Sequence, residues 1–173
     1  MRLGGVVLAG VLSVAVSGCG YHTAGHVKTL PQDIHTIAVP AFINQSRTYR
    51  VEQRLTAAVV RELVTRTNYR VVNEPDQSAD ATLQGIVLGT VAAPATYDSQ
   101  TGRAASVLVA VAVKVSLTDR HGKVLYENPS YSFRDQYQVS RELSSFFEED
   151  SPAWDRMSRA FARALVSNIL EGF

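Results

Sequence analysis

The stretch ASVLVAVAVKVSLTD, residues 105–119, alternates between branched apolar side chains and small or polar ones along its whole length. Neighbouring side chains of an extended strand point to opposite faces, so a period of two predicts a strand with one buried face. The apolar positions that share the buried face are Val107, Val109, Val111, Val113, Val115 and Leu117. The opposite face carries Ala110, Ala112 and Lys114 and is predicted to be open and smooth.

The segments on both sides of this strand are also predicted to be extended. Residues 119–123 contain Gly122 and read as a hairpin turn, which leads into a partner strand over residues 124–139. On the other side, residues 94–102 are expected to form a loop after a strand over residues 79–91. Three adjacent strands are therefore expected to form the centre of the sheet.

The predicted strand over residues 79–91 also has apolar residues at alternate positions. Ala81, Leu83, Val87 and Val91 are expected to lie on one face, with two glycines among them. Glycine inside a strand indicates a bulge or the close approach of another group.

Two segments have the helical spacing of apolar residues, namely residues 49–67 and the segment that begins at Pro152. Ser46 is expected to cap the first helix, which lies between predicted strands at 34–42 and 69–72. A strand, a helix and a return strand favour a right-handed crossover with the two strands parallel. The predicted fold is therefore α+β, a two-layer sandwich in which two amphipathic helices pack on one face of a four- to five-stranded mixed sheet.

The N-terminal sequence MRLGGVVLAGVLSVAVSGCG has one basic residue and then a short apolar run that ends in small residues. This pattern is typical of a secretory signal. The residues before Cys19 resemble the lipobox of bacterial lipoproteins, which implies cleavage before that cysteine and its acylation. We therefore expect a lipoprotein signal peptide at residues 1–18, a lipidated tether at 19–32 and a single α+β domain at 33–173.

Composition excludes several classes of function. The chain has 17 basic and 16 acidic residues, and Arg2 leaves with the signal, so no broad positive field for nucleic acid is expected. The four histidines are scattered, and no phosphate-binding, nucleophile-elbow or metal-ligand motif occurs. We therefore expect no enzyme activity, no cofactor and no metal site.

Candidate contact residues remain on the predicted open face and in one loop. Parity places Arg134 on the same face as Lys114, where two cations beside alanines could contact a partner or phosphates; an ordinary solvated face is the alternative. Phe146 and Phe147 lie in a polar loop, where they could enter a partner or cover the end of the core.

Several segments resemble the LptE family of lipopolysaccharide-assembly lipoproteins. They are CGYH (19–22), LPQDIHTIAVPAFINQS (30–46), the helical RVEQRLTAAVVRELVTRTNYRVV (50–72), ADATLQGIV (79–87), DRHGKVLYE (119–127) and WDRMSRAFARALVSNILEGF (154–173). The resemblance implies an outer-membrane lipoprotein, anchored by lipid on the periplasmic side. It also implies that the domain plugs an LptD-like β-barrel and helps to deliver lipopolysaccharide to the outer leaflet, without enzymatic chemistry.

A second resemblance stays open at this point. The β-α-β opening is also similar to lipoproteins of the curli-secretion type and to activators of peptidoglycan synthases. Those proteins act as protein-interaction modules, and the curli-type subunits have further helices after the sheet. This chain ends after one such helix, which favours the LptE resemblance.

Overall fold

The computed structural model describes residues 30–74, 76, 78–139 and 150–171. In these residues a mixed sheet has the strand order β3-β1-β4-β5-β6, and the short β2 pairs with β4 outside that path. The strands are β1 (Thr36–Ala38), β2 (Ile43–Asn44), β3 (Arg70–Val72), β4 (Ala81–Tyr97), β5 (Ala104–Asp119) and β6 (Val124–Gln138). Strand β1 is parallel to both β3 and β4, whereas β4, β5 and β6 are antiparallel neighbours.

Two helices, α1 (Val51–Arg66) and α2 (Asp150–Glu171), cover one face of this sheet. Arg54 Nη1 lies 3.4 Å from Asp155 Oδ1, and Arg66 Nη1 donates to Ser167 Oγ over 2.8 Å. Because contacts are made at both ends of α1 in the same sequence order, the helices run side by side in the same direction. The predicted α+β two-layer fold is confirmed, with the two-residue β2 added to the sheet.

The core lies between the helices and the face of β5 that the alternation predicts. Val109, Val111, Val113, Val115 and Leu117 are at most 1 % exposed. The ring of Phe161 on α2 packs edge-on against Phe42, Tyr131 and Phe133, at centroid distances of 5.6 to 6.3 Å. Edge-to-face packing of this kind is favourable for aromatic rings. The β5 alternation thus decides which face of the sheet receives the helices.

The predicted cap of α1 is wrong. Helix α1 begins after Arg50, whose φ of 57° is left-handed, and no side chain caps it. Ser46 instead belongs to a turn, in which Asn44 Oδ1 accepts hydrogen bonds from its N–H and its hydroxyl. The hydroxyl of Ser46 is therefore hydrogen-bonded within this turn and does not cap the helix.

Strand β4 departs from the predicted parity at one bulge. Val87 pairs with Val113, but Gly89 pairs with the adjacent Ala112, so Leu88 is an extra residue. Beyond it the faces exchange: Val87 is fully buried, whereas Val91 is 61 % exposed. The expectation that Val91 shares the buried face is therefore wrong, and the bulge that the glycines suggested is its cause.

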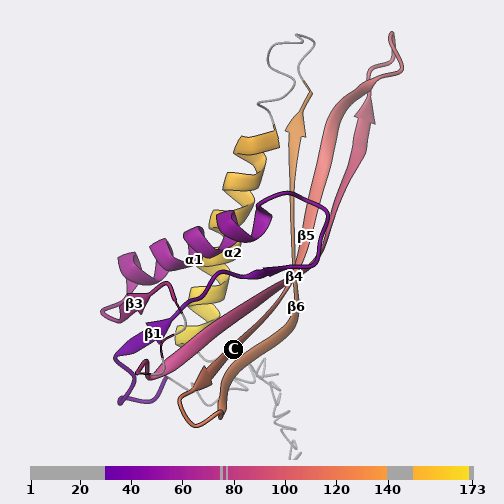
Figure 1. Cartoon of the computed structure of the whole chain (residues 1–173). Coiled ribbons are helices and arrows are strands. Elements are labelled where there is room, and N and C mark those ends of the chain that lie inside the picture. The colour runs from indigo at the N-terminus through magenta and orange to yellow at the C-terminus, as the bar shows by residue number, and fades with distance from the viewer. Residues whose placement is uncertain (1–29, 75, 77, 140–149, 172–173) are drawn as a thin grey trace, which may run out of the picture.

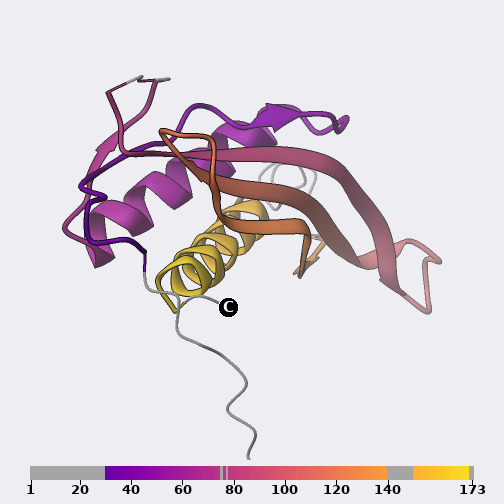
Figure 2. The same ribbon diagram turned by 90° about the horizontal axis from the view of Figure 1, so that it is seen from below.

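The hairpin of β4 and β5 is also longer than predicted. Strand β4 continues to Tyr97 through the segment expected to be a loop, and the turn closes with a 2.8 Å bond from Asp98 N–H to the carbonyl of Arg103. The hairpin tip extends beyond both helices (Figure 1). Figure 2 shows the same projection at right angles. The β5–β6 ladder also shifts register after Tyr131, and the residues left out of the pairing on β6 include Pro129.

Candidate functional site

The face of β4, β5 and β6 opposite the two helices is the candidate contact surface, and here we call it the open face. Rows of three side chains cross it, as the strand register shows. The central row consists of Gly89, Ala112 and Ser132, and the next one consists of Val91, Ala110 and Arg134. The centre of the open face is therefore made of small side chains, as the sequence predicts.

Lys114 lies on the open face beside an acidic partner. Its Nζ is 3.3 Å from Glu127 Oε1, and both side chains are a little under half exposed. An exposed pair of this kind contributes at most about 1 kcal/mol to stability. Glu127 also offsets the positive charge, so Lys114 is a weaker anion site than the sequence alone suggests.

Arg134 is exposed and lies directly opposite Ala110. It makes no ion pair with another described residue. Lys114 is four residues from Ala110 along β5, about 13 Å at the rise of a strand. The structure therefore brings the two predicted cations onto one face but not into one cluster.

Exposed apolar side chains border the small central residues. Ile43 on β2 pairs with Ile86, whose other neighbour is Lys114. Ile43, Leu88 and Val91 are 59, 41 and 61 % exposed. Sequence reasoning missed Val91 because it assumed unbroken parity on β4, although Gly89 indicated a possible bulge. Exposed apolar groups that gather on one face are typical of interaction surfaces.

The remaining predicted sites lie outside the described residues. Cys19, Phe146 and Phe147 belong to segments whose placement the structure does not describe. Their roles remain predictions.

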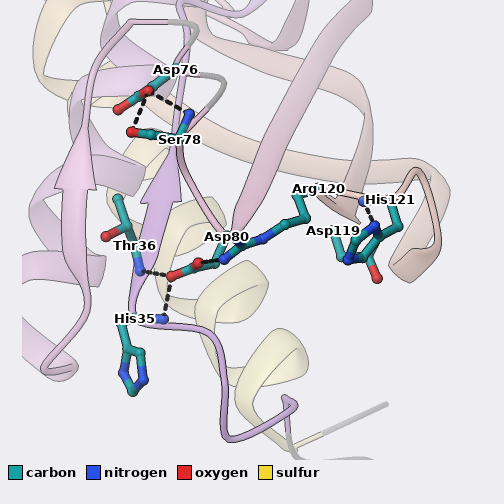
Figure 3. Close-up of polar contacts among 8 residues, drawn as sticks. All are labelled: His35, Thr36, Asp76, Ser78, Asp80, Asp119, Arg120 and His121. Atoms are coloured by element: carbon teal, nitrogen blue, oxygen red, sulfur yellow. Dashed lines mark hydrogen bonds and ion pairs between the residues drawn. The ribbon is translucent and has the colours of Figure 1, made fainter.

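Asp80 lies at the junction of β1, β4 and the β5–β6 turn (Figure 3). Its Oδ2 accepts hydrogen bonds from the backbone N–H groups of His35 and Thr36, at 2.8 and 2.9 Å. Its Oδ1 pairs with the Arg120 guanidinium, and the Arg120 N–H donates to its carbonyl over 3.0 Å. The two backbone hydrogen bonds are the main cause that lowers the pKa of the Asp80 carboxyl. Asp80 thus fastens three segments together.

The neighbouring carboxylates have similar structural roles. Asp119 Oδ1 accepts the N–H of His121, and Asp76 Oδ1 accepts the N–H and the hydroxyl of Ser78 (Figure 3). Asp119 Oδ1 also accepts the N–H of Lys123. Backbone hydrogen bonding from Lys123 lowers the pKa of Asp119, and the bonds from Ser78 lower that of Asp76. Within the described ranges no group of three or more histidine, cysteine or acidic side chains could hold a metal ion.

A shallow hollow of about 590 Å³ lies along the outer side of α1. Ala41 and Asn73 form one side of it, and Ala57, Val60 and Val64 form the other. Arg61 is the only charged residue of its lining. The lining contains no carboxylate, histidine or cysteine, and its hydroxyl groups are those of Thr56 and Thr65.

The family model described as LptE, lipopolysaccharide-assembly, matches residues 34–169. The chain belongs to the LptE family. The match contains every described strand and almost all of α2, and it favours the first of the two resemblances in the sequence. LptE-family proteins are lipoproteins of lipopolysaccharide assembly, so this chain is assigned to that process.

Solved structures share the fold of this LptE-family chain. Lipoprotein B from Nitrosomonas europaea has a TM-score of 0.55 and 14 % identity, with 87 % of this chain and 90 % of that one covered. A minor lipoprotein from Acinetobacter baumannii has a TM-score of 0.51 and 15 % identity, with 82 % and 95 % covered. At such low identity the likeness shows the fold alone. No curated protein matches the sequence.

Neither α1 nor α2 is both long and apolar enough to cross a membrane, and they are the two helices in the described ranges.

Proposed function

We propose that this chain is a lipoprotein of the outer membrane, held on its periplasmic side by acyl chains on Cys19. The lipobox-like sequence and the membership of the LptE family support the proposal. Residues 1–18 are the signal that is removed, residues 19–32 are the tether, and residues 33–173 are the domain. Stable anchoring takes more than one acyl chain, which a lipobox cysteine provides.

In this proposal the domain is a non-enzymatic plug and assembly component of the lipopolysaccharide translocon. Its partner is an LptD-like outer-membrane β-barrel, and it helps to assemble that barrel and to deliver lipopolysaccharide to the outer leaflet. The family match over residues 34–169 is the observation on which this function depends.

The open face is the proposed contact surface. Small side chains at Gly89, Ala110 and Ala112 let a second surface approach closely, and burial of the exposed Val91 contributes about 25 cal/mol per Å² of apolar area. Arg134 adds a charge that can donate hydrogen bonds to phosphate. Apolar area therefore favours the protein partner, and the cations favour the lipid A phosphates.

Co-purification tests the partnership. The tagged full-length protein, extracted in detergent from its own cells, is expected to bring down a large β-barrel together with lipopolysaccharide. Val91→Asp on the open face should reduce recovery of the barrel, whereas Arg159→Asp on the exposed side of α2 should not. Recovery of only a peptidoglycan synthase, or of homo-oligomeric rings, would contradict the proposal and favour the interaction-module alternative.

Processing tests the anchor separately. Inhibition of the lipoprotein signal peptidase with globomycin should leave unprocessed precursor in the membrane. Maturation at the normal rate under the inhibitor would exclude cleavage at a lipobox.

A further inference from the structure

Strand β6 lies at one edge of the described sheet. Its pairing with β5 determines which of its backbone groups point away from the sheet. The N–H of Val139 donates to the carbonyl of Ala105 over 2.9 Å, in register with the β5–β6 ladder. In an antiparallel pair, alternate residues exchange bonds with the neighbour, and the others turn both backbone groups outward. Ser132, Arg134 and Gln136 therefore direct their N–H and C=O groups away from β5.

At Gln136 both outward groups are already bonded. Its N–H donates to Asp135 Oδ1 over 2.7 Å, and its carbonyl accepts from Arg156 Nη2 on α2 over 3.3 Å. Arg156 Nε in turn lies 2.9 Å from Asp135 Oδ2. The three residues form a closed set of contacts that covers the edge at this point.

Stability alone is a weak reason for this arrangement. The side chains of Arg156 and Asp135 are 47 and 27 % exposed, so their ion pair contributes about 1 kcal/mol or less. Aspartate is also among the residues least favoured in strands. An unpaired edge, by contrast, is a ready template for another strand, and charged side chains on the edge are a common way to prevent this.

We propose that Asp135 and Arg156 form an edge guard, which stops a second copy of this chain from adding its own β6 to this edge. The second copy is the fitting occupant because two antiparallel β6 edges, related by a two-fold axis, are self-complementary at Ser132 and Arg134. While Gln136 is bonded in this way, a second strand can pair with β6 only up to Arg134. The ladder of hydrogen bonds between the two copies is then too short to hold a dimer. This guard is independent of the proposed function.

The test uses the full-length protein in detergent. Asp135→Ala and Arg156→Ala should produce a concentration-dependent dimer in light scattering, where the wild type keeps one protein mass. In the dilute, monomeric range, exchange of the Gln136 amide hydrogen should be about tenfold faster in Asp135→Ala, because one hydrogen bond is lost. Asp135→Val and Arg156→Met, whose side chains cannot make these hydrogen bonds, provide the same test if the alanine variants fold poorly.

Two controls separate the guard from a general effect of a lost ion pair. Arg54→Ala removes a comparably exposed pair, with Asp155, away from this edge, and it should leave the mass unchanged. Ser132→Pro removes an outward N–H without loss of a bond to β5, so added to Asp135→Ala it should abolish the dimer. The proposal is overturned if the guard variants keep the wild-type mass at every concentration, or if the dimer persists with Ser132→Pro.

Discussion

The ring of Phe42 occupies the space beside Gly85 where any other residue would place its β-carbon. Three ring atoms lie closer than 3.0 Å to that position, nearer than real β-carbons are found. Phe42 is 3 % exposed and also packs edge-on against Phe161. The absence of a side chain at Gly85 thus lets the segment after β1 enter the core between β4 and α2.

Gly85→Ala should therefore destabilise the protein by about 1–3 kcal/mol, because the well-packed ring has to move. Urea unfolding of the full-length protein in detergent measures the change. Gly89→Ala is the matched control in the same strand, because a β-carbon there meets no atom within 4 Å. Equal losses for the two variants would show that glycine is required for some reason other than the ring.

A buried hydroxyl joins α2 to β6. Asn168 Nδ2 donates to the Tyr131 hydroxyl over 2.6 Å, and that hydroxyl also bonds with the hydroxyl of Tyr126. Burial is the main cause that raises the pKa of Tyr126, and the hydrogen bond with Tyr131 raises it further. Tyr131→Phe removes the hydroxyl that both Asn168 and Tyr126 contact, and the loss of these hydrogen bonds should cost about 1–3 kcal/mol of unfolding free energy. Tyr126→Phe leaves the bond to Asn168 intact and should cost less; the reverse order would contradict this network.

Asp80 should make stability depend on pH on the acidic side. Its pKa in the folded protein lies below the ordinary value of 3.8, so the unfolded chain binds the proton more readily. Its contribution is therefore complete above about pH 4 and is lost as the pH falls through the folded pKa. Asp80→Asn should flatten the loss of unfolding free energy between about pH 5 and pH 2, as measured by urea titrations at each pH. Asp33→Asn, at an exposed position, is the control, and equal slopes for both variants would exclude the role of Asp80.

Because of the bulge at Leu88, substitution of two valines in β4 should affect the free energy of unfolding to very different extents. Val91→Ser should change the free energy of unfolding by less than about 0.5 kcal/mol, because this side chain is 61 % exposed. Val87→Ser should cost about 2 kcal/mol or more, because the hydroxyl enters the core. Chemical denaturation distinguishes them, and a large loss at Val91 would mean that β4 keeps unbroken parity.

The cations of the open face should differ in their effect on lipopolysaccharide. Arg134→Glu should reduce capture of lipopolysaccharide by about tenfold, the size of one lost charge-assisted hydrogen bond. Lys114→Glu should have a smaller effect, because Glu127 already offsets its charge. The double variant should keep its thermal midpoint, and Arg159→Glu on α2 is the control for net charge. Unchanged capture by the double variant would remove both residues from the contact surface.

The sequence by itself determined the sheet and the face that the helices cover. The period of two in residues 105–119 requires one buried face of the sheet. The two predicted helices each have apolar residues on one side, and these have to pack against such a face. It also placed Arg134 on the face of Lys114, and the register with β5 sets it opposite Ala110 on that face.

Only the tertiary structure decided where parity breaks and which charges are paired. The extra residue at Leu88 depends on the register with β5, which no local pattern fixes. The contact of Arg156 with Asp135 joins residues that are 21 positions apart, and that of Asp80 with Arg120 spans 40. Such contacts arise when packed elements bring distant segments together, so their partners become visible only once the chain is folded.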